Sequence, residues 1–121
     1  MIGIGVDLVE VDRMRTAITR TPTLAGRLFT EGERTYAESA KDPAERFAAR
    51  FAAKEAVMKA LGVGLGAVEW HDIEVLRAES GAPSLRLTGR AAALAADAGI
   101  SRWLLTLTHT RTTAEAIAVA L

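Results

Sequence analysis

The chain opens with a strict alternation of apolar residues and small or polar ones. Between residues 2 and 9, aliphatic side chains occupy the even positions, and glycine or aspartate occupies the odd positions up to Asp7. A period of two residues is typical of a β-strand. Two further alternating runs, at residues 103–110 and 114–121, are joined by three polar residues and predict a β-hairpin at the end of the chain.

Helix signals fill the chain between residues 10 and 62. Thr30 followed by Glu33 is a capping-box pattern, Pro43 stands at a tolerated first-turn position, and Gly62 is a typical C-cap. Pro22 disfavours helix in the residue before it and so ends the first helix. The expected helical segments are residues 10–19, a short turn at 24–29, then 30–40 and 42–61.

The rest of the chain predicts two more strands and one more helix. Residues 72–77 and 84–87 predict strands on either side of a Ser-Gly-Ala-Pro turn, and residues 88–98 predict an alanine-rich helix that Gly99 ends. The coarse order is one strand, three helices with the short extra turn among them, two strands, one helix and two strands. Helices and hairpins segregated in this way indicate an α+β fold. No linker or repeat interrupts the pattern, so we expect one domain over residues 1–121.

Charge and composition exclude several classes of protein. Fifteen basic and fifteen acidic side chains among 121 residues give a formal net charge of zero and a sequence pI of about 6.7. A neutral chain has no global basic field for nucleic acid, and the absence of cysteine excludes disulfides, thiolate metal sites and thiol nucleophiles. The apolar runs are far shorter than the roughly 18 residues that cross a bilayer, and the N-terminus lacks a signal-peptide pattern. We therefore expect a cytoplasmic protein without nucleic-acid or membrane partners.

Four charged residues interrupt the apolar surface of the long predicted helix: Arg50, Lys54, Glu55 and Lys59. Burying an unpaired charge costs several kcal/mol, so these side chains need an explanation. In one interpretation, Glu55 and Lys59 form an i,i+4 ion pair worth about 0.3 to 0.5 kcal/mol, and the other basic groups extend to water. In the other, a carboxylate holds a cation in a polar pocket, and the three basic residues receive an anion.

Asp7 also allows two interpretations. It could cap the following helix while Gly3 and Gly5 permit close backbone packing, or the two glycines could clear space for a ligand beside its carboxylate. Asp7 and Glu55 together offer two oxygen donors from different elements, which is a typical protein contribution to Mg²⁺ when phosphates and water complete the shell. With no cysteine and only two histidines, a dedicated zinc site is not expected. The sequence therefore favours magnesium.

Three segments of the chain resemble the holo-acyl-carrier-protein synthases, the small type of 4′-phosphopantetheinyl transferase. The opening run IGIGVDLVEVDR is similar to the first motif of that family, and RFAAKEAVMKALG, which begins at Arg50, is similar to the second. The segment TLTHT, which begins at Thr106, is similar to the C-terminal histidine segment, where the family commonly has serine at the first position. The resemblance spans the chain from Ile2 to about Thr110.

The resemblance implies a fold, an activity and an assembly. The fold would be a single compact α+β domain with a small, largely antiparallel sheet packed around a long central helix. The activity would be transfer of the 4′-phosphopantetheine arm of coenzyme A to a serine of an apo acyl carrier protein, with release of adenosine 3′,5′-bisphosphate, in support of fatty-acid biosynthesis. The assembly would be a homotrimer with sites between neighbouring subunits.

The resemblance also assigns residues to the site. Asp7 and Glu55 match the ligands of the magnesium ion that holds the pyrophosphate, and Lys59 matches a position at the phosphates, so these three would be the catalytic residues. The residues expected to contact coenzyme A are Arg50, Lys54, Lys59, Gly62, Pro83, His109 and Thr110. Because acyl carrier proteins are acidic, we expect Arg13 and Arg20 on the first predicted helix to bind the carrier.

Phosphoryl transfer needs neutralisation of charge more than a covalent nucleophile, and a metal with a positioned lysine supplies it. The serine proton would go either to Glu55 or to a magnesium-bound water; the water is favoured, because a carboxylate that holds a metal is a poorer base.

Two other functions compete with this one. The first is hydrolysis of a nucleotide pyrophosphate, and the second is a non-catalytic oligomeric module whose charges are only interface ion pairs. Trp70 and Trp103 are expected to anchor the core.

Overall fold

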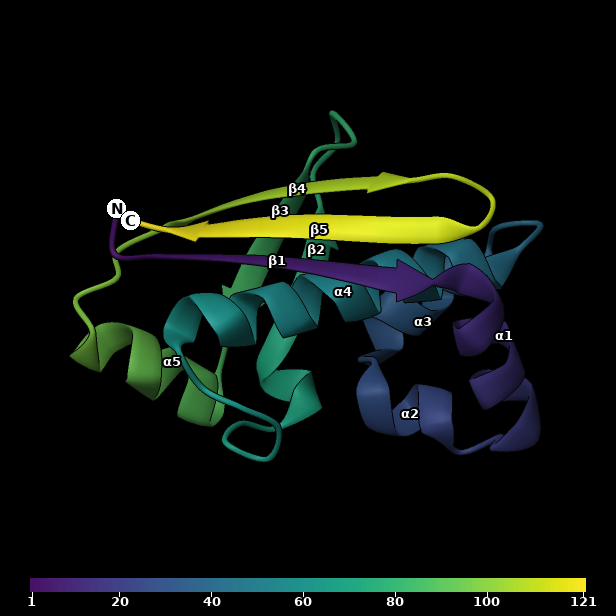
Figure 1. Ribbon diagram of the computed structural model, residues 1–121, viewed down its shortest axis with the longest axis horizontal. Coiled ribbons are helices and arrows are strands. Elements are labelled where there is room, and N and C mark those ends of the chain that lie inside the picture. Colours follow the sequence, from purple (N-terminus) through teal and green to yellow (C-terminus); the bar gives the residue numbers. More distant parts are fainter.

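Helix α4 (Pro43–Leu61) lies lengthwise against one face of a three-stranded sheet, and the other helices surround its two ends (Figure 1). The computed structural model describes residues 1–121. The remaining elements are β1 (Gly3–Glu10), α1 (Val11–Arg20), α2 (Leu24–Leu28), α3 (Glu31–Glu38), the 3₁₀ helix η1 (Trp70–Asp72), β2 (Ile73–Arg77), β3 (Pro83–Leu87), α5 (Gly89–Asp97), β4 (Trp103–His109) and β5 (Thr113–Ala120). No helix combines the length and the apolar character needed to cross a membrane.

The strands form two antiparallel sheets. The first has the order β1-β5-β4, and the second is the β2-β3 hairpin. Both predicted hairpins are confirmed, and the strands form two small antiparallel sheets packed on α4. The β2-β3 hairpin lies beside β4, and Ile73 and Val75 of β2 share a core cluster with Ala116 and Ala118 of β5.

The predicted helix boundaries hold to within one or two residues, because the local signals form as expected. Thr30 and Glu33 make the reciprocal capping box that opens α3. Gly62 ends α4 in the left-handed conformation with φ of 73°, which glycine adopts without strain. Asp42, at the other end of α4, makes no cap with its side chain and binds Arg15 at 2.7 Å instead.

The glycines of β1 let the strand approach α4 at backbone distance. A Cβ built on Gly5 would lie 1.9 Å from the carbonyl oxygen of Ala56, and one on Gly3 would lie 2.2 Å from that of Ala60. Alternate alanines of β5 are buried on the same helix and keep that neighbouring strand close as well. The glycines therefore serve close backbone packing, but Asp7 does not cap α1, which has Glu10 at its N-cap position and no side-chain cap. The packing instead brings Asp7 beside α4.

We expect Gly5→Ala to destabilise the fold by about 3 kcal/mol, because the new methyl group meets a helix carbonyl that cannot move away without shifting α4. The measurement is the free energy of unfolding in urea, followed by circular dichroism. Gly64→Ala is the matched control, since a Cβ at Gly64 would meet no atom within 4 Å. A Gly5→Ala protein with the stability of the control would contradict this packing.

The outer face of the three-stranded sheet is apolar and exposed. Ile4, Val6 and Leu8 of β1 are 58%, 47% and 65% exposed, and Leu104 of β4 is 51% exposed. The register places Ile4 and Leu104 on either side of Val119, and Val6 beside Ile117, so these side chains form one continuous surface. In the single chain, the glycine side of β1 is thus buried, and its aliphatic side is uncovered.

Candidate active site

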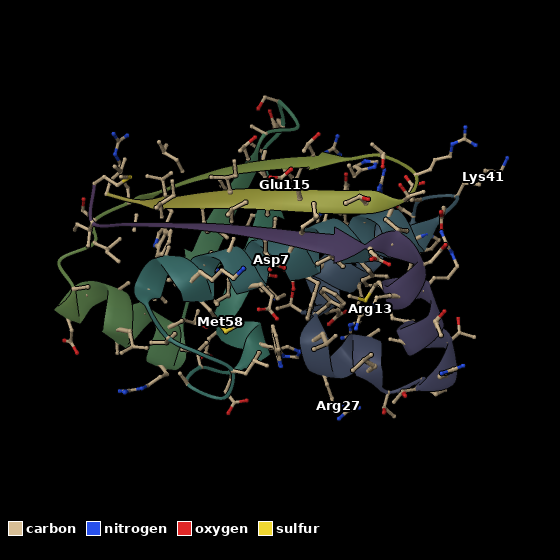
Figure 2. All side chains as sticks on the ribbon, viewed as in Figure 1. Asp7, Arg13, Arg27, Lys41, Met58 and Glu115 are labelled. Carbon is tan, nitrogen blue, oxygen red and sulfur yellow. The ribbon has the colours of Figure 1, made fainter.

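A groove of about 550 Å³ lies where β1 runs into α1. Four charged residues reach it: Asp7, Glu10, Arg13 and Glu55. β1 carries Asp7, α1 carries Arg13, and α4 carries Glu55. Figure 2 marks Asp7 and Arg13 on the helical side of the sheet. The structure therefore brings the two predicted metal ligands into one cavity together with one of the two predicted carrier-binding residues.

The charges at this groove differ from the simple ion pair considered for α4. Lys59 Nζ lies 3.0 Å from Asp7 Oδ1 and donates to the carbonyl oxygen of Val6 at 2.9 Å, so Lys59 pairs with β1 and forms no ion pair with Glu55. Burial and the neighbouring negative charge of Asp7 raise the pKa of Glu55, and the charge of Lys59 offsets only part of this. Asp7 and Glu55 thus repel each other in the absence of a bound cation.

This donor set suits magnesium. No group of three or more histidine, cysteine, aspartate or glutamate side chains is placed to hold a metal. Two carboxylates can hold only an ion that takes its other ligands from substrate and water, and Mg²⁺ bound next to phosphates is such an ion. A cation between Asp7 and Glu55 would also relieve their repulsion. The residues present therefore fit the predicted magnesium ion.

The rest of the groove is an apolar wall. Phe51 and Trp70 stack with ring centroids 5.2 Å apart, and both rings line the groove. The other apolar lining residues are Leu8, Val9, Met14, Ala17, Leu24 and Leu28. Trp70 is half-buried, so it does more than anchor the core as the sequence suggested: it forms part of the surface that faces Glu55.

A second cavity, of about 370 Å³, contains other predicted coenzyme A contacts. Arg50, Pro83 and His109 line it, together with Thr106. His109 Nδ1 lies 3.5 Å from Glu45 Oε2, an ion pair when the imidazole is protonated. Pro83 begins β3, and β3 lies against β4, which carries Thr106 and His109 (Figure 1).

Three arginines surround one tyrosine at this second cavity. The guanidinium carbons of Arg46, Arg50 and Arg77 lie 4.0, 4.1 and 5.1 Å from the centre of the Tyr36 ring. None of the three forms an ion pair with a carboxylate. The cavity is therefore lined by concentrated positive charge without a neutralising partner, which is a site for an anionic ligand.

Arg50 is the buried residue of this cavity whose hydrogen bonding is incomplete. Its side chain is only 5% exposed, and its buried Nε has no hydrogen-bond partner. Burial lowers the pKa of Arg50, and the partly opposing influences of Tyr36 and Glu33 do not cancel this effect. Sequence reasoning found Arg50 but missed Tyr36, Arg46 and Arg77; the i,i+4 spacing of Arg46 and Arg50 was the one available signal.

Lys54 was predicted to receive an anion, and this is wrong. Its side chain is fully buried, and its Nζ lies 2.8 Å from Glu33 Oε1 and donates to the carbonyl oxygens of Trp70 and Ile73. A lysine has three N–H donors, so the ammonium has none left for coenzyme A. Burial lowers the pKa of Lys54, and the charge of Glu33 opposes that shift.

The other predicted residues lie at the edges of these cavities. Gly62 caps α4, and Thr110 Oγ1 accepts hydrogen bonds from the backbone N–H groups of Thr112 and Thr113 in the β4-β5 turn. Neither residue lines the groove or the second cavity. Arg20 is exposed seven residues after Arg13 on α1, which is about two turns, so the two arginines share one side of the helix.

The two cavities have no lining residue in common. The groove contains the carboxylates Asp7 and Glu55, and the second cavity contains Arg50, Pro83 and His109. α4 separates them, because Phe51 and Glu55 lie one turn apart on one side of the helix and Arg46 and Arg50 lie one turn apart on another. One chain thus presents two separate cavities.

Comparison with known proteins identifies the family. The model of the 4′-phosphopantetheinyl transferase superfamily matches residues 3–120. The chain belongs to this superfamily. A holo-[acyl-carrier-protein] synthase of Frankia casuarinae is 52% identical to it over 120 residues, which cover 99% of this chain and 97% of the relative.

Solved structures agree with the assignment to the phosphopantetheinyl transferases. The crystal structure of holo-[acyl-carrier-protein] synthase from Neisseria meningitidis has a TM-score of 0.90 and 32% identity, and the match covers 100% of this chain and 98% of that one. The synthase from Helicobacter pylori, solved in complex with coenzyme A, has a TM-score of 0.86 and 26% identity, with 98% and 99% covered. The predicted α+β fold and the family resemblance are confirmed.

Proposed function

We propose that this chain transfers the 4′-phosphopantetheine arm of coenzyme A to a serine of an apo acyl carrier protein. The serine Oγ forms a bond to the phosphorus of the arm, the pyrophosphate P–O bond breaks, and adenosine 3′,5′-bisphosphate leaves while the serine gives up its proton. The observation that carries the proposal is the pair Asp7 and Glu55 in one groove, with Lys59 bound to Asp7. Membership of the transferase superfamily supports it.

Asp7 and Glu55 would hold the magnesium ion. When bound there, the ion would supply positive charge to the pyrophosphate oxygens. Lys59 is about half exposed, so its ammonium can turn from Asp7 toward a phosphate. Burial and Asp7 raise the pKa of Glu55 only while no cation is bound, and a cation held by Asp7 and Glu55 would lower it again. This shift therefore does not favour Glu55 over water as the acceptor of the serine proton.

The arginine cluster at the second cavity would bind the nucleotide end of coenzyme A. Coenzyme A carries a 3′-phosphate and a pyrophosphate, and Arg50 offers a buried guanidinium whose Nε lacks a partner. Charge-assisted contacts with phosphate are strong, and they would repay the cost of burying Arg50. Pro83 and His109 line the same cavity and would contact the same ligand.

The separation of the two cavities supports a homotrimer with sites between subunits. A ligand that needs both sets of residues can reach them only if neighbouring chains place one groove beside another chain's arginine cluster. A closed ring of identical head-to-tail interfaces does this three times in a trimer. The uncovered apolar face of β1, β5 and β4 supplies the surface for such contacts.

The proposed acceptor is an acidic carrier protein of fatty-acid biosynthesis in the cytoplasm. Arg13 lies at the groove and Arg20 about two turns along the same helix, so α1 presents positive charge beside Glu55 in a chain that is neutral overall. Local charge of this kind guides an acidic partner to the site.

The test is intact-mass spectrometry of an apo acyl carrier protein after incubation with this protein, coenzyme A and magnesium. The expected result is a gain of one phosphopantetheine, which a chelator prevents. Cleavage of coenzyme A without any carrier would instead show a hydrolase that uses water as the acceptor. An unmodified carrier and no stabilisation of the protein by coenzyme A would favour a non-catalytic module.

A further inference from the structure

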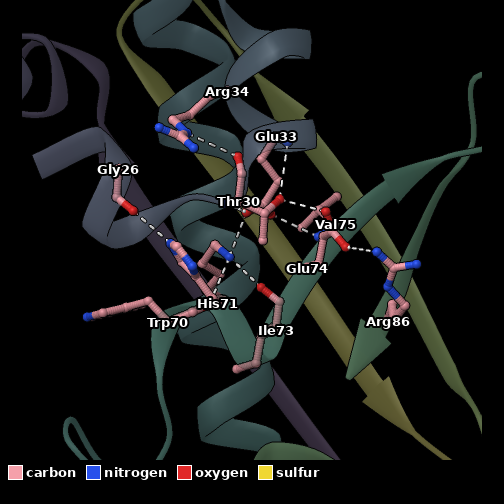
Figure 3. A network of polar contacts seen from close by, with 11 residues as sticks. Gly26, Thr30, Glu33, Arg34, Trp70, His71, Ile73, Glu74, Val75 and Arg86 are labelled. Carbon is pink, nitrogen blue, oxygen red and sulfur yellow. Dashed lines mark hydrogen bonds and ion pairs between the residues drawn. The ribbon is translucent and has the colours of Figure 1, made fainter. Parts of the chain in front are cut away.

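A network of buried polar groups lies behind the groove, and the mechanism does not use it (Figure 3). Its centre is Lys54, which directly precedes Glu55 on α4 and is fully buried. The Lys54 ammonium lies 2.8 Å from Glu33 Oε1, donates to the carbonyl oxygen of Trp70 at 3.0 Å, and donates to that of Ile73. These contacts join α4 to α3, to η1 and to the start of β2.

Glu33 is as deeply buried as Lys54, being 1% exposed, and it connects further elements. Its Oε1 accepts the N–H of Thr30 at 2.9 Å, and its Oε2 accepts the N–H of Val75 at 2.9 Å. One carboxylate therefore completes the cap of α3, pairs with α4 and fixes β2. Two of its three contacts are with backbone N–H groups, of Thr30 and Val75, and the third is with the Lys54 ammonium, so the pair restricts how these elements can lie relative to one another.

The network reaches the groove through Trp70. Lys54 holds the main-chain oxygen of Trp70, while the indole of Trp70 stacks on Phe51. Phe51 and Glu55 are one turn apart on α4, and all three side chains at this point (Phe51, Glu55 and Trp70) line the groove. Nε2 of the next residue, His71, lies 2.7 Å from the carbonyl oxygen of Gly26 on α2. This contact joins η1 to α2, which forms another wall of the groove.

Stability alone does not explain this pair. A buried ion pair gains little net stability over apolar side chains of similar size, because both charges lose their hydration. The directed bonds of the pair, by contrast, hold η1 and its Trp70 at a fixed distance from Glu55, which follows Lys54 on α4. We propose that the Glu33–Lys54 pair positions Trp70 against Phe51 and thereby sets how the carrier serine approaches Glu55. This inference rests on the proposed function for the identity of the acceptor, but not for the placement of Trp70.

The experiment uses Trp103→Phe as the parent protein, because it leaves Trp70 as the single tryptophan. Lys54→Met alone would strand the buried Glu33 carboxylate and unfold easily. The informative variant is Glu33→Gln/Lys54→Met, which leaves no charge of this pair in the core. We expect folded protein by circular dichroism, about twofold stronger quenching of Trp70 by acrylamide, and a KM for apo carrier raised about tenfold, with kcat and the KM for coenzyme A within about twofold of the parent.

Two further variants make the result specific. Glu33→Gln alone keeps an oxygen acceptor but leaves the buried Lys54 ammonium without its counter-charge, so it should lower the unfolding midpoint and shift the quenching and the carrier KM in the same direction. Leu94→Ala is the control for general loosening, because Leu94 packs on the core from α5, at the far end of the molecule from α1 and α2 (Figure 1). Leu94→Ala should lower the unfolding midpoint without changing the quenching of Trp70 or the KM for apo carrier.

Parental quenching and parental carrier KM in both network variants would overturn the inference. The same changes in Leu94→Ala would also overturn it, since loosening of the fold would then explain them. If the parent protein transfers nothing to any carrier, the proposed function fails, whereas the quenching of Trp70 still decides whether the pair positions this residue.

Discussion

Glu55→Gln should reduce transfer to the carrier by about 10³-fold and at the same time raise the midpoint of thermal unfolding of the metal-free protein. The loss of activity follows because an amide removes half of the charge that would hold the magnesium ion, and with it the neutralisation of the pyrophosphate. The gain in stability follows because Asp7 and burial disfavour the ionised form of Glu55, which is why its pKa is raised.

The sign of this stability effect can be worked out from linkage. A carboxyl group whose folded pKa lies above its unfolded pKa favours the fold at low pH, and that contribution is lost as the pH rises through the folded value. At neutral pH the ionised Glu55 therefore opposes folding, and the neutral glutamine does not. The stability difference between the two proteins should shrink when the pH is lowered below the ordinary pKa of glutamate.

The measurements are the rate of carrier modification and the unfolding midpoint, each with magnesium and with a chelator. Adding magnesium to the coenzyme A complex should further stabilise the unaltered protein, and it should not further stabilise Glu55→Gln. Glu38→Gln is the matched control, because Glu38 is an exposed helical glutamate far from the groove and should leave both readouts unaltered. A Glu55→Gln protein that is active, or that is less stable without metal, would contradict the role given to Glu55.

Local signals predicted the elements of this fold because each one depends on a few neighbouring residues. The Thr30–Glu33 capping box, the Gly62 cap and the alternation of β1 all act within a few positions of the chain. The pair Asp7 and Glu55 was predicted from the donor chemistry of two carboxylates and from the family resemblance. The structure adds the reason that they meet, which is that β1 packs on α4 through its glycines.

Side chains whose partners lie on distant elements could not be assigned in the same way. The pattern of α4 showed that Lys54 points into the core, but the sequence did not show that Glu33, already used in a helix cap, would meet it. Arg77 reaches the ring of Tyr36, on α3, from the end of β2, about forty residues later in the chain. The alternation of β1 showed which residues share a face but not which face α4 would cover.

A mixture of two inactive variants should recover activity if each site is shared between subunits. Glu55→Gln disables the groove, and Arg50→Met disables the arginine cavity while removing a buried charge that has no ion-pair partner. In mixed trimers, a groove from an Arg50→Met chain can meet an arginine cavity from a Glu55→Gln chain. With random assembly of equal amounts, about a quarter of the sites contain both intact halves, because each half is intact with a chance of about one half.

The recovery requires exchange of subunits, and this provides the control. Chains that are unfolded together and refolded, or made together in one cell, should show roughly a quarter of the activity of the unaltered protein. Separately assembled proteins mixed for a time too short for exchange should show none. If Asp7, Glu55 and the arginine cavity of the same chain instead formed one site, every chain in the mixture would carry a broken site, and no activity would return under either condition. One outcome is a quarter of the activity and the other is none. The assay therefore decides whether neighbouring subunits build the active site from the two cavities that are separate in one chain.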